Sequence, residues 1–354
     1  MPINIKKLPK SEMEITGEIP AEDFDKFVAQ SIKNLAQNME IPGFRRGHVP
    51  EKIALERIGE DAILHEAAEL ALQNEYPKIL QSEKIEAIGR PQIAITKMAR
   101  GNALEFKIKT AVLPKIKLPD YKNIASKVPP AAKPEIEEKE ITEALDYLRK
   151  ARASNETGTE TNSGNKTNDL PELNDDFAKS VGQFNTLEEL KKALRENISF
   201  EKEMKNKEKR RTDILQNIAE AITWELPDII IEAEKDKMIA EMRGNIESMG
   251  LKWEDYLKNI KKPEDELKKE WQSEAEKRVK YGLVIQEIGV QEHIEPSETE
   301  IEAYANQTLE RYGRANHAKI DKNRLKEYAQ SVLGNEKTLH FLETCENKPT
   351  DTEK

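Results

Sequence analysis

The sequence contains a single cysteine, Cys345, among 354 residues. One thiol cannot form a disulfide within its own chain, which excludes the disulfide-stapled class of secreted domains and suits a reducing compartment. The five histidines are too scattered to give a His-x-x-x-His pair, and no Gly-x-x-x-x-Gly-Lys-Ser/Thr motif for nucleotide phosphates is present. We therefore expect no metal and no cofactor.

Long apolar runs and an excess of positive charge are also lacking. No stretch approaches the roughly 18 apolar residues of a membrane-spanning helix, and the first residues lack the apolar core of a signal peptide. The 67 acidic residues outnumber the 57 basic ones, giving a net charge of −10, whereas a whole-surface nucleic-acid binder is basic. These features predict a cytoplasmic protein with no membrane or DNA partner, so any RNA contact must come from a local basic spot.

The first third of the chain shows mixed periodicity. Apolar residues alternate in some segments, as in strands, and recur every three or four residues in others, as in helices. This pattern predicts an α+β domain over residues 1–114. We expect strands over 2–8, 12–19, 92–96 and 104–109, a helix over 20–38 and a second helical region over 53–80.

Two segments of unusual composition follow. Four prolines between residues 115 and 134 predict an extended connector, because proline disfavours helix and central strand alike. Helical spacing returns over 135–152. Residues 153–168 contain nothing apolar beyond one alanine, which predicts a flexible linker.

From Thr186 onward the sequence is helical in pattern. Thr186 with Glu189 and Ser297 with Glu300 form candidate capping boxes that mark two helix starts. Residues 201–213 are polar on almost every face, as expected for a solvent-exposed helical arm. We expect an extended all-α domain with helical arms over 135–345, interrupted by the linker, and a disordered tail over 346–354.

One helical stripe in this second half has two interpretations. Met238, Met242, Ile246 and Met249 recur on one helical face. Such a stripe commonly packs in a core. Thioethers are also flexible and polarizable, so a Met-rich surface can accept many partner shapes. The four residues are therefore candidate client-binding residues, with core packing as the alternative.

The most distinctive stretch is the loop Ile41–Pro50. Two glycines and two prolines shape its backbone, and an apolar ring stands beside two guanidinium groups that can bind phosphates or carboxylates bidentately. This combination indicates a docking tip. The alternative is an ordinary helix connection with the ring in the core. The candidate residues are Gly43, Phe44, Arg45, Arg46, Gly47, His48 and Pro50.

The Gly-Phe-Arg-x-Gly-x-x-Pro pattern of this loop resembles the ribosome-docking signature of bacterial trigger factors, and the resemblance extends over residues 1–152 and 170–345. It implies an α+β ribosome-binding domain followed by an all-α chaperone domain with arms. It further implies that the loop docks near the exit tunnel of the large ribosomal subunit, on protein and rRNA. The helical domain would then shield unfolded nascent polypeptides without ATP.

The sequence departs from this family in one place. Most trigger factors carry a prolyl-isomerase domain resembling the FK506-binding proteins where this chain has the polar segment 153–168. Sixteen polar residues cannot build such a domain, because domains below about 40 residues rarely fold unaided. We therefore expect no enzyme activity. The alternatives are a peptidyl-prolyl isomerase as in full-length members, or a helical adaptor for a folded partner.

Overall fold

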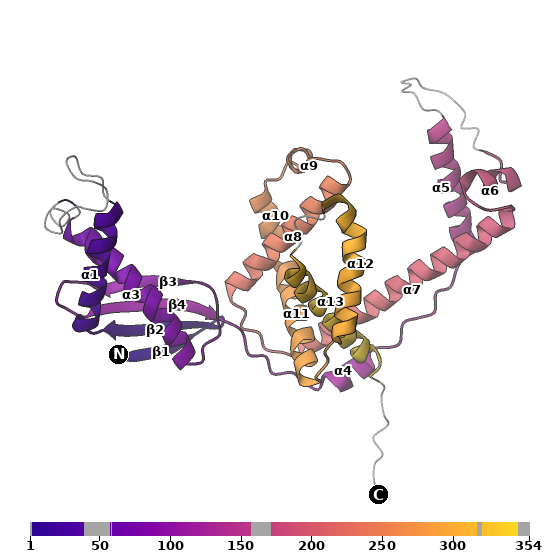
Figure 1. Ribbon diagram of the computed structural model, residues 1–354. Helices are drawn as coiled ribbons and strands as arrows, with labels where there is room; N and C mark the ends of the chain where they lie inside the picture. Colours follow the sequence, from indigo (N-terminus) through magenta and orange to yellow (C-terminus); the bar gives the residue numbers. More distant parts are fainter. Residues whose placement is uncertain (1, 39–56, 58, 157–170, 317–320, 346–354) are drawn as a thin grey trace, which may run out of the picture. The chain divides into compact units, whose positions relative to one another are not determined.

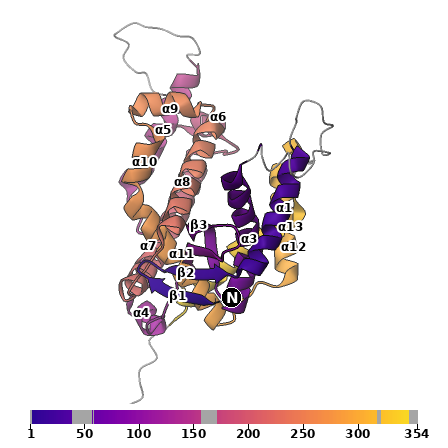
Figure 2. The same ribbon diagram turned by 90° about the vertical axis from the view of Figure 1, so that its left-hand side faces the viewer.

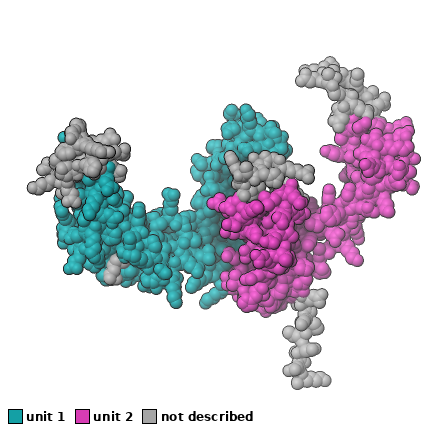
Figure 3. Space-filling model, viewed as in Figure 1, with its two compact units in different colours: residues 1–117, 223–283 teal, residues 118–222, 284–354 magenta. Residues whose placement is uncertain are grey.

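The computed structural model describes residues 2–38, 57, 59–156, 171–316 and 321–345. These residues group into two compact units, each described separately below (Figure 3). The first combines residues 1–117 with 223–283, and the second combines 118–222 with 284–354. The predicted boundaries at 114, 134 and 345 concern independently folding domains and stay a prediction.

A four-stranded antiparallel sheet organises the amino-terminal part of the first unit (Figure 1). Its order in space is β1-β2-β4-β3, so the two edges are β1 and β3. All four strands were expected from alternation, and the carboxy-terminal pair is longer than expected, because both strands continue to pair beyond the alternating residues, as Ala87 does with Val112. The strands are β1 (Ile3–Leu8), β2 (Glu12–Ile19), β3 (Ala87–Lys97) and β4 (Leu104–Val112).

Helices α1 (Ala21–Asn38) and α3 (Glu60–Ser82) cover one face of this sheet (Figure 2). Every second residue of β4 from Leu104 to Thr110 is buried, as the period of a half-buried strand requires. Phe24 of α1 and Ile15 of β2 are fully buried in the shared core. The expected amphipathic helix over 20–38 is therefore confirmed, and its apolar stripe faces the sheet.

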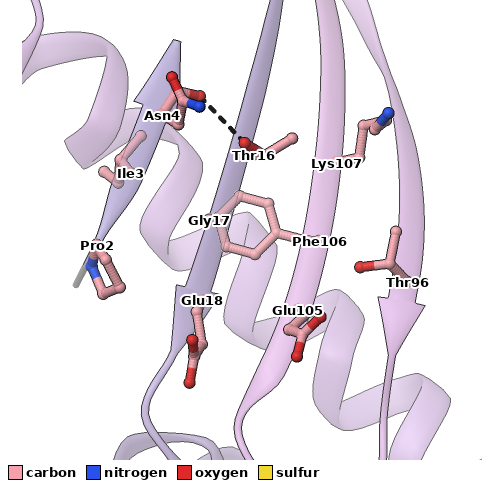
Figure 4. A pocket seen from close by; sticks show the side chains of 10 residues that line it. All are labelled: Pro2, Ile3, Asn4, Thr16, Gly17, Glu18, Thr96, Glu105, Phe106 and Lys107. Atoms are coloured by element: carbon pink, nitrogen blue, oxygen red, sulfur yellow. Dashed lines mark hydrogen bonds between the residues drawn. The ribbon is translucent and has the colours of Figure 1, made fainter.

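Gly17 in β2 is needed because an aromatic ring occupies the space above it. The ring of Phe106 on β4 lies across Gly17, its registered partner (Figure 4). A Cβ added at Gly17 would lie 2.6 Å from Cζ of Phe106, closer than carbon atoms approach without displacement. The small residue thus lets the large one close the inner face of the sheet.

The rest of the first unit is helical. The structure divides the helical stretch from Glu264 to Gln291 at Trp271, whose side chain packs against two apolar clusters. One cluster lies between α8 and α11, and the other between α8, α9 and α10. The helices are α8 (Asp228–Ser248), α9 (Trp253–Ile260), α10 (Glu264–Glu270) and α11 (Gln272–Gln291), of which residues 272–283 belong to this unit.

The secondary structure in the described part of the second unit consists of helices, and α7 is 34 residues long. Both predicted helix starts are capped: Glu189 N–H donates to Thr186 Oγ1 at 3.2 Å, and Glu300 N–H donates to Ser297 Oγ at 3.3 Å. The reciprocal bond of a capping box forms at Ser297, whereas the Glu189 carboxylate accepts from Asn185 N–H. The helices are α4 (Tyr121–Lys127), α5 (Glu138–Glu156), α6 (Asp175–Val181), α7 (Leu187–Glu220), α12 (Glu298–Asn316) and α13 (Lys322–Glu343). No helix within the described ranges is long and apolar enough to cross a membrane.

Two expectations need correction. The connector 115–134 is not extended throughout, because α4 forms between its prolines and is capped by Asp120, whose side chain accepts from Asn123 N–H at 3.2 Å. The linker does not begin at residue 153, since α5 continues to Glu156. Residues 157–168 of the expected linker and the expected tail 346–354 lie outside the described residues.

Candidate docking and client-binding surfaces

The predicted docking loop falls in a part of the chain that the structure does not describe. This applies to Gly43, Phe44, Arg45, Arg46, Gly47, His48 and Pro50, all within residues 39–56. The structure does place the helices on either side, since α1 ends at Asn38 and α3 begins at Glu60. Gly59 has a φ of +82°, which a helix does not allow, so α3 begins directly after it at Glu60. This lies within the helical region expected over 53–80.

The two helices that flank the loop are locked together. The Ser31 hydroxyl of α1 is fully buried and lies 2.9 Å from the Val28 carbonyl oxygen and 3.1 Å from that of Ile63 in α3. Three buried alanines of α3 allow the close approach of its neighbours: Ala67, Ala68 and Ala71. The segment 39–59 is therefore anchored at both ends on a densely packed core.

The methionine stripe of α8 is divided between the two interpretations. Met238 is buried in one apolar cluster, while Ile246 is buried and Met242 partly buried in the other. For these three residues the structure shows packing, partial in the case of Met242, and their role in client binding stays a prediction. Met249 is 75% exposed and remains a candidate client-binding residue.

A neighbouring residue that sequence analysis missed shares this exposure. Leu251 is 55% exposed and is separated from Met249 by Gly250, whose φ is +79°. The turn is braced at Trp253, because the Arg243 guanidinium lies 5.3 Å from its ring centroid and its indole N–H donates to Glu264 Oε2 at 3.1 Å. The missed signal is a pair of large apolar residues around a glycine, just past the end of a helix.

The middle of α7 offers a second exposed apolar pair. Phe200 is 65% exposed and Met204 is 48% exposed, and their spacing of four residues places them on one helical face. The extended chain before α5 runs beside this stretch, since Lys202 donates to the Glu135 carbonyl and Asn206 to the Ala132 carbonyl. The helix is polar around these residues, as predicted, but Phe200 was not singled out.

An ionic cluster joins α7 to α13 in the second unit. Arg211, whose side chain is only 11% exposed, donates to Glu336 at 2.6 Å and to Glu343 at 2.8 Å. The hydrogen bonds to Glu336 and, to a smaller extent, to Glu343 raise the pKa of Arg211. The same guanidinium lowers the pKa of Glu336. The contact between these helices therefore depends on charges.

The groups with perturbed pKa values do not assemble into a catalytic arrangement. Burial raises the pKa of the Tyr121 hydroxyl, which bonds to Glu292, and Lys122 at 2.7 Å lowers the pKa of Glu292. Burial also raises the pKa of the Cys345 thiol, which disfavours the nucleophilic thiolate. Among the described residues there is no group of three or more His, Cys, Asp or Glu side chains that could hold a metal ion.

Comparison with protein families decides the assignment. The family model described as bacterial trigger factor protein matches residues 1–148, and the model of the trigger factor carboxy terminus matches residues 186–343. This chain belongs to the bacterial trigger factor family. The two matches together cover most of the chain, including the sheet region and the long helices. The fold expected from the resemblance is thus confirmed: α+β at the amino terminus, then an extended helical region.

Relatives of this trigger factor are similar over most of their length. "Trigger factor" of Halothermothrix orenii is 25% identical, with 85% of this chain and 88% of the relative covered. "Trigger factor" of Clostridium botulinum strain Kyoto is 24% identical, with 97% and 98% covered. A solved structure titled "Promiscuous Substrate Recognition in Folding and Assembly Activities of the Trigger Factor Chaperone" shares the fold, with a TM-score of 0.52, 16% identity and 97% of this chain covered.

This trigger factor has fewer residues than one of its aligned relatives. The alignment with the Clostridium botulinum protein runs over 422 positions, more than the 354 residues of this chain, so that relative contains residues without counterpart here. In this chain α5, α6 and the start of α7 form one lobe around Leu145, Phe177 and Leu190. Arg149 of α5 donates to the Pro171 carbonyl oxygen at 2.7 Å and so ties together the residues on either side of 157–170.

Proposed function

We propose that this trigger factor is an ATP-independent cytoplasmic chaperone that docks near the exit tunnel of the large ribosomal subunit, contacting protein and rRNA. Docking uses the 43–50 loop, with Phe44 and Arg45 as the main contacts. The helical region then shields apolar segments of newly made polypeptides. The observation that carries this proposal is the family match over both ends of the chain.

The anchoring of α1 and α3 supports the role of the loop. A docking element works best on a firm base, because ordering a loose segment on binding costs about 0.5–1.5 kcal/mol per immobilised side chain. The buried Ser31 bridge and the alanines of α3 provide that base on both sides of residues 39–59. The exposed cations that remain in this region, such as Lys33 on α1, provide matched controls.

The exposed apolar pairs support the shielding of clients. Met249 with Leu251, in the turn after α8, and Phe200 with Met204, on the polar middle of α7, present apolar surface. Burying one such side chain against a client contributes about 1.5–3 kcal/mol. Two separated small patches would therefore bind many apolar segments weakly and release them readily, which suits transient protection.

Co-sedimentation with ribosomes tests the docking. The double variant Phe44→Ala, Arg45→Ala loses one apolar and one charged contact, together about 3–6 kcal/mol, so its bound fraction should fall by more than tenfold. Lys33→Ala, which removes an exposed cation of the flanking helix, should pellet like the parent chain. If the double variant pelleted as well as the parent, the loop would not be the docking element.

Aggregation of a denatured client tests the shielding. The parent chain should suppress aggregation, whereas Phe200→Ser with Met204→Ser should suppress it less. Glu203→Ser, an exposed change on the same helix, is the matched control. A helical adaptor for a folded partner would not suppress aggregation in any of these forms, so that outcome would favour the adaptor.

We also propose that the chain is not an enzyme, since the two family matches leave only residues 149–185 between them. A proline-limited refolding assay tests this directly. The refolding rate should equal the uncatalysed rate at every chain concentration. Acceleration proportional to concentration would instead show prolyl-isomerase activity.

A further inference from the structure

The two edges of the sheet are built differently. Edge strand β3 contains Pro91, and its register with β4 shifts twice, between Ile88 and Gln92 and between Ile95 and Lys97. Prolines and bulges are the usual devices that prevent a further strand from pairing with an edge. Edge strand β1 has neither device, and its register with β2 is unbroken over all six residues.

The outer side of β1 presents free backbone groups. Glu18 N–H donates to the Pro2 carbonyl oxygen at 3.3 Å, so residues 2, 4, 6 and 8 lie at the hydrogen-bonded positions of the antiparallel pair. The N–H and C=O groups of Ile3, Ile5 and Lys7 consequently point away from β2. In the part of the chain that the structure describes, no backbone hydrogen bond is made to them.

The side chains along this edge indicate what would pair with it. Ile3 and Ile5 are half-buried against the core beneath α1 and α3, so residues opposite them on an added strand would extend an apolar face. Lys6 and Lys7 are exposed and form no ion pair with a described residue, while the nearby Lys10 is paired with Asp228 at 2.9 Å. Lys6 lies on the opposite face of the strand from Ile3 and Ile5, so residues opposite Lys6 would best be acidic and those opposite Ile3 and Ile5 apolar.

We propose that the β1 edge pairs with an extended polypeptide segment in which apolar residues alternate with acidic ones. The segment adds a fifth strand to the sheet through the free backbone groups of Ile3, Ile5 and Lys7. Backbone pairing provides affinity with little dependence on sequence, and alternate side chains add preference. This inference rests on the proposed chaperone function and gives it a second, backbone-directed way of recognising clients.

Lys7 allows the edge to be closed without disturbing the core. Lys7→Pro removes an outward N–H, while the exposed side chain contributes no packing and the bonds between β1 and β2 remain. Lys7→Gln removes the same charge but keeps the N–H. The two variants together separate loss of a backbone donor from loss of a cation.

The probe is a fluorescent synthetic peptide of alternating valine and glutamate, and fluorescence anisotropy with the full chain is the measurement. We expect Lys7→Pro to weaken binding by at least about tenfold and Lys7→Gln by about threefold or less. The same peptide with N-methyl groups on alternate residues, along the edge that would pair, should bind at least about tenfold more weakly than the parent peptide. Equal binding of the peptide to Lys7→Pro and the parent chain would overturn the proposal.

Two further measurements keep the interpretation unambiguous. Sedimentation velocity on the parent chain and Lys7→Pro tests the other occupant, a second copy of this chain. A dimer lost in Lys7→Pro, with peptide binding unchanged, would assign the edge to self-association and overturn the proposal. Suppression of client aggregation by the parent chain is measured in parallel, so that failure of the chaperone function itself is distinguished from failure of this edge.

Discussion

The sheet region and the long-helix region of this trigger factor are held together by different forces. Phe24 of α1 and Phe106 of β4 lie in an apolar core with almost no exposed surface. Along the middle of α7, between the buried Leu190 and Ile214, ionic contacts recur, with Lys202 bonded to Glu140 at 2.7 Å and Arg211 bonded to two glutamates. Apolar burial fixes a structure firmly, whereas an ion pair with access to solvent, such as Lys202 with Glu140, contributes about 0–1 kcal/mol. The helices that flank the predicted docking loop are thus held by apolar packing, and the middle of α7 relies more on charges.

The largest difference in unfolding free energy should appear when a phenylalanine is replaced by alanine in each of the two regions. Phe24→Ala removes a fully buried ring and should lower the free energy of unfolding by about 3–5 kcal/mol. Phe200→Ala, on the exposed face of α7, should change it by about 0.5 kcal/mol or less. Hydrogen exchange in each region, monitored as urea is increased, measures the loss of stability in both variants. Similar losses for the two variants would contradict the contrast between the regions.

The next effect concerns the ionic cluster of the second unit. Arg211→Ala leaves Glu343, whose side chain is only 9% exposed, without its closest cation and should cost about 3 kcal/mol. Arg211→Met combined with Glu343→Leu should recover most of this loss, because an apolar pair can replace a buried ion pair. Hydrogen exchange of α7 and α13 gives the readout. A double variant as unstable as the single one would show that the cluster acts through more than charge pairing.

Two glycine substitutions should act in opposite directions. Gly17→Ala places a Cβ against the Phe106 ring and should destabilise the sheet by about 1–2 kcal/mol. Gly244→Ala, in the middle of α8 with nothing within 4 Å of the added atom, should stabilise by about 0.5–1 kcal/mol. Thermal unfolding checks both signs. Stabilisation by Gly17→Ala would mean that the ring moves aside at little cost.

The smallest effect is a dependence on pH at the start of α12. Hydrogen bonds from Lys337 and, to a smaller extent, from Ser297 hold the pKa of the Glu300 carboxyl at about 2, below its ordinary 4.5. Because the folded-state pKa is lowered, the stabilisation is complete above about pH 4.5 and is lost as the pH falls toward 2. Glu300→Gln should therefore destabilise α12 at pH 6 but make no difference near pH 2. Hydrogen exchange of residues 298–310 at the two pH values is the measurement.

Local patterns were the most predictable part of this fold. The strands, α1 and both helix caps follow from side-chain alternation and from side chains that bond to their own backbone, so a few neighbouring residues suffice to determine them. The docking loop was predicted from its residues and stays a prediction. The predicted arm is present as a long helix, since its polar circumference offers nothing for a core to cover.

The features that were left open or missed depend on distant residues. The methionine stripe has the same spacing whether it packs or stays open, and only the clusters formed with α9, α10 and α11 decide that Met238 is buried and Met249 exposed. The short helix α4 was missed because prolines on both sides favour extended chain, whereas Asp120 caps a helix between them. The break at Trp271 likewise reflects packing against two clusters at once.

The bond from Arg149 to the Pro171 carbonyl has a consequence for stability. It joins the two ends of the segment that follows α5, within the lobe formed by α5, α6 and the start of α7. Closing a longer excursion between pinned ends costs only about 0.6 kcal/mol for each doubling of its length. A longer segment at this position would therefore cost the lobe little stability.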